Sequence, residues 1–218
     1  MALSGQGEKT ISLLLIAFIF LFPHYSYLPL FLYVPVVLLV VWLFLKYISN
    51  ESFKNIFFSF KSFETKSIWV GALSAIILFG TLGFLVLPLL KKVFPHEVID
   101  LKDFDFIKHN PIHFIFVLLM ALIVGGFYEE LVFHCFIFTR FEKLFASKNY
   151  VIISFILTNI IFGAYHYQQA ILGIINAFIA GCAYHALILK HNRNLWYGLF
   201  FHTFFDFIGL TFIFLGHS

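Results

Sequence analysis

The sequence predicts an all-α membrane protein, a bundle of about seven or eight transmembrane helices around a polar cavity. Of the 218 residues, 61% are hydrophobic and only 11% are charged, and the mean hydropathy is +0.96. Soluble domains are about half apolar and a quarter charged, so this composition excludes a water-soluble globule. Several uncharged apolar runs are also about 20 residues long, the length that a spanning helix needs. We expect one transmembrane domain over residues 1–218.

Seven apolar runs predict the spanning helices. Six of them are long and cover residues 28–45, 68–90, 112–128, 150–165, 170–189 and 195–215. The run 11–22 is shorter and follows Lys9, as the core of a signal peptide would. Because no small-residue cleavage site follows it, we expect a retained helix and therefore seven spans.

The loop charges predict the orientation in the membrane. If the N-terminus is cytoplasmic, the loops on the opposite side contain only four of the fourteen Lys and Arg residues: Lys91, Lys92, Lys102 and Lys108. Cytoplasmic loops carry an excess of Lys and Arg, so we expect a cytoplasmic N-terminus, in a plasma or inner membrane rather than the endoplasmic reticulum. The formal net charge of +3 is slight and scattered, which argues against a nucleic-acid partner.

Two connecting segments are expected at the membrane surface. In residues 51–66, apolar side chains recur at helical spacing with lysines between them: Phe53, Ile56, Phe57, Phe60 and Phe63. This pattern predicts an amphipathic helix in the headgroup region, acting as a membrane anchor or as a substrate gate. The segment 98–110 mixes acids, lysines and aromatic residues. Residues 1–110 would thus supply N-terminal helices and interfacial segments, and residues 111–218 the catalytic core.

Three acidic residues lie within or against apolar helices: Glu129, Glu130 and Asp206. A carboxylate there costs about 2.5–3.5 kcal/mol even on lenient scales. The nearest basic residue, Arg140, is expected at the membrane interface. The available partners inside the helices are three histidines: His134, His166 and His202. We therefore expect carboxylates and imidazoles to pair.

The spacing of these residues supports a shared polar centre. Glu130 and His134 are four residues apart, as are His202 and Asp206, so each pair shares a helix face. A stripe on the helix between them contains Asn159, Phe162, Gly163 and His166. Adjacent carboxylates in a low dielectric repel each other, and the cost of Glu129 beside Glu130 predicts a function. Taken singly, His134 could equally have a packing role and Asp206 could be a helix-to-helix contact.

A carboxylate that faces an imidazole across a water molecule is a general-base arrangement. The resulting hydroxide attacks a carbonyl carbon, and a second imidazole with a polar neighbour can stabilise the oxyanion. Ser154 stands alone on its helix, and Cys135 and Cys182 lie in apolar runs that offer neither a disulfide framework nor a Cys-rich metal site. There is no HExxH or GxGxxG motif. Hydrolysis by an activated water fits the residues best.

Three segments of the chain resemble the motifs of one family. Residues 129–134 (EELVFH), 162–166 (FGAYH) and 202–206 (HTFFD) are similar, in order, to EExxxR, FxxxH and HxxxN/B. This signature is that of the CAAX-processing and bacteriocin-processing (CPBP, Abi) family of intramembrane proteases, which includes the Rce1-type CAAX prenyl endopeptidases. The resemblance covers about the last 90 residues.

The resemblance implies roles for these residues. Glu129 would be the general base, His166 would bind or polarise the water, and Glu130 would support the base. The oxyanion-stabilising pair would be His202 and Asp206, and the remaining expected binding residues are His134, Asn159 and Phe162. The family is often labelled as metalloproteases, although a metal-free glutamate mechanism is also implied. The cofactor is thus either none or zinc, and Glu129, His166 and His202 could supply a two-His-one-carboxylate zinc site.

The substrate implied by the resemblance is a membrane-associated peptide or a lipidated protein, including a prenylated CAAX-type tail, with membrane lipid around it. Two positions depart from the motifs: His134 stands in place of Arg, and Asp206 stands where Asn is more frequent. A histidine titrates where an arginine does not, and an aspartate donates a hydrogen bond only when protonated. Both departures predict activity that depends on pH between 5 and 8.

Two other functions stay open. An inactive family member could act as a membrane immunity or regulatory protein that binds a peptide without cleaving it. The departures from the motifs at His134 and Asp206 favour this alternative. A proton-coupled transporter would also use buried acids and histidines. Transporters usually show repeated halves, whereas the polar residues here crowd into the C-terminal half, so transport is the weakest candidate.

Overall fold

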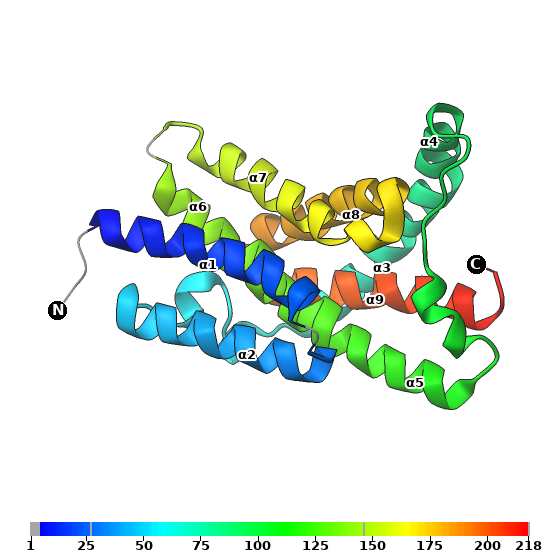
Figure 1. Ribbon diagram of the computed structural model, residues 1–218, viewed down its shortest axis with the longest axis horizontal. Coiled ribbons are helices and arrows are strands. Elements are labelled where there is room, and N and C mark those ends of the chain that lie inside the picture. The colour runs from blue at the N-terminus through cyan, green and yellow to red at the C-terminus, as the bar shows by residue number, and fades with distance from the viewer. Residues whose placement is uncertain (1–4, 27, 146, 218) are drawn as a thin grey trace.

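The chain folds into an elongated helix bundle (Figure 1). The computed structural model describes residues 5–26, 28–145 and 147–217. Within these ranges the secondary structure is entirely helical, with turns between helices and no strand. The predicted all-α fold is confirmed.

Seven helical segments form the bundle, and α4, at the end of the third one, stands across its long axis (Figure 1). In chain order they are α1 (Gly5–Tyr25); α2 (Leu30–Leu43) with η1 (Phe44–Ile48); α3 (Thr65–Thr81) with η4 (Leu82–Val86) and α4 (Leu87–Val93); α5 (Pro111–Met120) with η6 (Ala121–Ile137) and α6 (Phe138–Leu144); α7 (Tyr150–Tyr165); α8 (Ala170–Lys190); and α9 (Leu195–Phe214). Five segments are long and apolar enough to cross a membrane, and two, Leu32–Ile48 and Tyr150–Tyr165, are shorter apolar helices. All seven predicted runs are found here as helices.

The last helix, α9, lies in the middle of the bundle and packs against α3, η6, α8 and α5. Its approach to α3 depends on a glycine: a Cβ on Gly71 would lie 2.7 Å from the backbone nitrogen of Phe201. Small residues let membrane helices approach closely in this way. On the other flank, α1 and α2 pack together, and α2 also packs on η6. Helices α9 and η6 therefore face each other at the centre.

The fourth segment is longer than expected. The predicted span ends at Tyr128, but the helix continues through Glu129 and Glu130 to Leu144, a segment of 34 residues. Arg140, expected at the interface, is buried with only 1% of its side chain exposed. It pairs with Glu51 and donates to Ser49 Oγ at 2.8 Å. The continuation is possible because partners from other segments neutralise these charged side chains inside the bundle.

The prediction of an amphipathic helix over residues 51–66 is wrong. The structure has two short 3₁₀ turns instead, η2 (Phe53–Ile56) and η3 (Phe60–Ser62), separated by Phe57 with φ of 68°. Backbone carbonyls of this segment accept hydrogen bonds from the start of α9 rather than from their own helix. Phe57 O accepts from the backbone N–H of Leu195, and Ser59 O accepts from Trp196 Nε1. Tertiary contacts with α9 thus outweigh the helical pattern.

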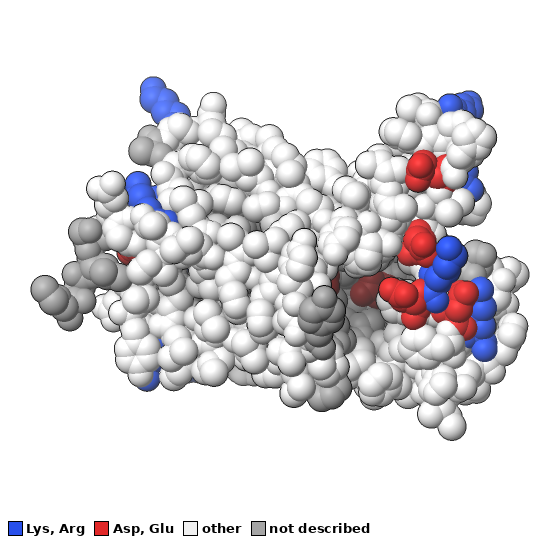
Figure 2. Space-filling model, in the orientation of Figure 1, with Lys and Arg blue, Asp and Glu red and all other residues white. Residues whose placement is uncertain are grey.

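Charged residues gather at the two ends of the long axis, with an uncharged band between them (Figure 2). The end that carries the start of α1 shows basic side chains in this view. The opposite end shows acidic and basic side chains together. An uncharged band between charged ends is the surface that a membrane-spanning bundle requires.

Candidate active site

The double glutamate lies in the widest part of the fourth helical segment. Residues Ala121–Ile137 form a π-helical stretch, η6, that includes Glu129, Glu130 and His134. Most of its side chains are buried. Because π-helical geometry occurs frequently at functional sites, this stretch indicates a functional site at the centre of the bundle.

Glu130 is fully buried and connects two histidines. Its Oε2 accepts a 2.8 Å hydrogen bond from Nδ1 of His134, one turn along η6. Its Oε1 accepts a 2.8 Å hydrogen bond from Nδ1 of His202 on α9. Because an ionised carboxylate only accepts, both Nδ1 atoms carry protons. The Nε2 atom of His202 is therefore the one that faces away from Glu130.

Glu129 faces two imidazoles without touching either. Its Oε2 lies 3.8 Å from Nε2 of His166 at the end of α7, and 4.0 Å from Nε2 of His202. These separations exceed a direct hydrogen bond, and polar contacts of this length are those that a water molecule bridges. The structure thus places Nε2 of His166 and Nε2 of His202 within 4.0 Å of the same carboxylate oxygen of Glu129.

The tautomer of His166 follows from its neighbour. Nδ1 of His166 lies 2.9 Å from the backbone carbonyl oxygen of Phe162, one turn earlier. A carbonyl can only accept, so Nδ1 donates. In the neutral ring Nε2 is then an acceptor, and it is Nε2 that faces Glu129.

Asp206 lies one helical turn beyond His202, with its Oδ2 3.6 Å from Nε2 of that histidine. Its side chain is 29% exposed, against 14% for His166, 12% for Glu129 and 6% for His202. The exposure rises from Glu130, which is fully buried, toward Asp206. The polar cluster is therefore open to the surface on the Asp206 side.

The three predicted binding residues occupy different places. Phe162 lies among the histidines, with its ring centroid 4.8 Å from those of His134 and His166 and 6.0 Å from that of His202. His134 is fully buried behind Glu130. Asn159 faces α8 and lies within 3.1 Å of Nδ1 of His185. The structure thus groups Phe162 with the catalytic candidates and sets Asn159 apart from them.

Sequence reasoning missed several residues that shape the site. Tyr184 stacks on His202, with ring centroids 4.4 Å apart and an interplanar angle of 20°. A Cβ on Gly125 would lie 2.5 Å from Oδ2 of Asp206, and one on Gly198 would lie 2.8 Å from Oε2 of Glu130. A side chain at either position would therefore have to displace the carboxyl group of the facing helix. Gly125 and Gly126 just before the double glutamate were the available signal, because small residues mark close helix contacts in membranes.

The three predicted zinc ligands, Glu129, His166 and His202, lie near one another. Glu129 Oε2 stands 3.8 and 4.0 Å from the two imidazole nitrogens. No group of three or more His, Cys, Asp or Glu side chains in residues 5–26, 28–145 and 147–217 is arranged to hold a metal ion. The zinc site formed by Glu129, His166 and His202 stays a prediction.

Comparison with known proteins gives one match. Residues 111–208 match the family model described as type II CAAX prenyl endopeptidase Rce1-like. No curated protein and no solved structure matches the chain. The matched region contains the π-helical stretch, α7 and the two polar residues of α9. Together with the long apolar helices, the match makes the chain a multi-pass integral membrane protein whose residues 111–208 are similar to the Rce1-like family.

Proposed function

We propose that this protein is an intramembrane endopeptidase that uses a water molecule activated by Glu129 and His166. One observation carries the proposal: a carboxylate oxygen and an acceptor nitrogen face each other across 3.8 Å inside a helix bundle. A water molecule has two protons to donate, one to each acceptor. Its lone pairs are then directed away from both, toward an incoming carbonyl carbon.

The reaction balances with these groups alone. Glu129 takes a proton from the water as the water oxygen attacks the carbonyl carbon of the scissile peptide bond. The tetrahedral intermediate carries the negative charge on the former carbonyl oxygen. Glu129 then gives its proton to the leaving nitrogen as the carbon–nitrogen bond breaks. The products are a new carboxyl group and a new amine.

His202 is the proposed donor to the oxyanion. Its Nδ1 is committed to Glu130, so Nε2 is the atom available to the reacting group. In the proposed mechanism Nε2 carries a second proton, with the carboxyl group of Asp206 3.6 Å away. With this proton in place, Nε2 donates to the developing negative charge. Glu130 and His134, both fully buried, would hold His202 in position rather than contact the substrate.

The proposed substrate is a membrane-associated peptide or lipidated protein, including a prenylated CAAX-type tail. The family description names a CAAX prenyl endopeptidase, and the polar cluster lies within apolar helices that a lipidated substrate can reach from the bilayer. We further propose a cytoplasmic N-terminus, because the basic loops predicted on that side lie at the end of the bundle with the start of α1. Labelling of single cysteines at positions 9 and 102 with a membrane-impermeant reagent tests this orientation.

Cleavage of quenched-fluorescent peptides by the purified protein tests the activity. Each peptide is used with and without a farnesyl group on its cysteine. We expect cleavage by the wild type, and losses of about 10²-fold or more in Glu129→Gln and His166→Ala, the range for removing a general base. Asn159→Ala is the matched control, because Asn159 lies on the same helix as His166 but faces His185.

Equal activity of Glu129→Gln and the wild type would remove the proposed base. Tight binding of the peptides without cleavage by any form would favour the alternative of a peptide-binding immunity or regulatory protein. A fall in pH inside proteoliposomes that accompanies uptake of a solute, without peptide cleavage, would instead favour the transporter.

A further inference from the structure

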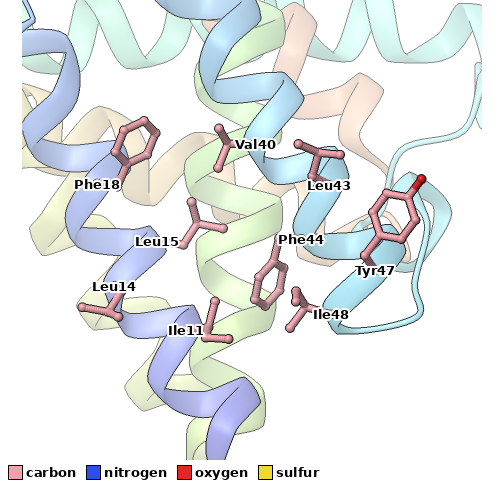
Figure 3. A pocket seen from close by; sticks show the side chains of 9 residues that line it. All are labelled: Ile11, Leu14, Leu15, Phe18, Val40, Leu43, Phe44, Tyr47 and Ile48. Atoms are coloured by element: carbon pink, nitrogen blue, oxygen red, sulfur yellow. The ribbon is translucent and has the colours of Figure 1, made fainter. Parts of the chain in front are cut away.

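A groove on the membrane-facing side of the bundle lies between α1 and the segment formed by α2 and η1 (Figure 3). Its volume is about 430 Å³, within the range of about 300–1,000 Å³ that is typical of ligand pockets. Every lining residue is apolar or aromatic: Ile11, Leu14, Leu15, Phe18, Val40, Leu43, Phe44, Tyr47 and Ile48. Figure 3 shows Ile11 and Leu15 of α1 turned toward Val40 and Phe44 across the groove.

The groove has a polar end and an apolar end. Lys46 lies beside its mouth, with Nζ 5.0 Å from the ring centroid of the lining residue Tyr47 and 4.8 Å from that of Trp42. Aromatic and basic residues together mark the headgroup level of a membrane. Beyond Ile11 and Ile48, a 2.6 Å hydrogen bond from Ser49 Oγ to Glu8 joins the two helices. The groove thus begins at the membrane surface and runs into the hydrocarbon region.

Its length is about two-thirds of the hydrocarbon depth of one leaflet. From Ile11 to Phe18 the lining follows α1 for about 10 Å at 1.5 Å per residue. Half of the hydrocarbon core of a bilayer is about 15 Å thick. A single chain of one lipid in this leaflet fits that depth.

We propose that this groove binds one acyl chain of an anionic phospholipid, with the phosphate beside Lys46. The lining offers only hydrocarbon contacts, and a membrane supplies hydrocarbon chains at high concentration. The choice of an anionic headgroup follows from charge, because the end of the bundle at which the groove opens is basic (Figure 2). The groove is separate from the site of the proposed hydrolysis. It lies along the first half of α1, whereas the other end of α1, at His24, packs against Tyr165 next to His166.

Native mass spectrometry of the full-length protein, with palmitoyl-oleoyl phosphatidylglycerol or phosphatidylcholine added, tests the proposal. We expect one retained phosphatidylglycerol per chain and a clear preference over phosphatidylcholine. Val40→Trp fills the groove and should abolish retention of either lipid. Leu39→Trp is its matched control, because Leu39 is a lipid-exposed neighbour that does not line the groove. The control should retain phosphatidylglycerol as the wild type does.

Lys46→Gln tests the headgroup contact without altering the packing. It should lower the preference for phosphatidylglycerol about fivefold, the effect of one basic residue near a membrane surface, whereas Lys92→Gln at the other end should not. Equal retention of both lipids, or identical behaviour of Val40→Trp and Leu39→Trp, would overturn the proposal. Displacement of the lipid by a farnesylated peptide would show that the groove binds substrate instead. A dimer of the chain that forms only when the groove is empty would show that the groove is an interface between two copies.

Discussion

Nδ1 of His134 donates a 2.8 Å hydrogen bond to Oε2 of Glu130, one turn earlier on the same π-helical stretch. The related motif has arginine at this position, so a neutral or charged imidazole here takes the place of a permanent cation. The other nitrogen of the ring, Nε2, is buried and makes no hydrogen bond with the described residues. The hydrogen bond therefore holds the Glu130 carboxylate in place from within its own helix.

Replacing His134 with arginine should change the pH dependence of cleavage. The two departures from the related motif predict wild-type activity that depends on pH between 5 and 8, because a histidine can change its charge in this range and an arginine cannot. In His134→Arg the charge beside Glu130 is constant, so this part of the profile should become flat. Peptide cleavage measured across that range checks the expectation, with Asp206→Asn as a second variant. An unchanged profile in His134→Arg would exclude position 134 as the source of the pH dependence.

A glycine on α9 makes room for Glu130. A Cβ at Gly198 would lie 2.8 Å from Oε2 of Glu130 and 2.5 Å from Cδ1 of Ile188. Gly198→Ala should therefore displace the glutamate, lower activity and destabilise the fold by about 1–3 kcal/mol. Gly209→Ala on the same helix is the control, since its nearest neighbour would be 3.9 Å away. Equal activity of the two variants would show that Glu130 needs no close approach of α9.

Two arginines should contribute very differently to stability. Arg140, 1% exposed, pairs with Glu51 and Ser49, whereas Arg193 is 40% exposed and pairs with Glu142. Breaking a buried pair costs about 3–5 kcal/mol, and a partly exposed arginine is expected to cost less because water solvates part of its charge. Arg140→Met should thus lower the free energy of unfolding in detergent by several kcal/mol, and Arg193→Met should lower it by less. Similar losses in both variants would contradict the buried network.

The same network predicts an acid dependence of stability. Burial acts to raise the pKa of Glu51, but the hydrogen bond from Lys143 and the charge of Arg140 outweigh it and hold the pKa below its usual value. A carboxyl with a lowered folded-state pKa stabilises the fold above its unfolded pKa, about 4.3, and loses this contribution as pH falls through the folded value. The stability difference between the wild type and Glu51→Gln should be constant near neutral pH and vanish in acid. A difference that persists in acid would exclude the charge as its source.

Local spacing made part of the site predictable. The pairs Glu130–His134 and His202–Asp206 are each four residues apart, and helical geometry alone places each pair on one face. The long apolar runs likewise identified all seven helical segments, because length and hydropathy are local properties of the chain.

Contacts between distant segments were not predictable. The hydrogen bond between His202 and Glu130 joins residues 72 positions apart, and Arg140 finds its partner Glu51 89 positions away. The prediction of a helix over residues 51–66 failed for the same reason. Hydrogen bonds from the distant helix α9 take the place of those within a regular helix. Hydrophobic periodicity reports which face of a segment is apolar but not which distant backbone it meets.

Cleavage of a farnesylated peptide tests most directly whether Glu129 and His166 activate the water. The wild type and Glu129→Gln are compared with and without a chelator, after the metal content of each protein has been measured. The geometry of Glu129, His166 and His202 predicts cleavage that survives chelation and disappears in Glu129→Gln. Cleavage that is lost on chelation and restored by zinc, or that persists in Glu129→Gln, would contradict a water activated by Glu129 and His166 alone.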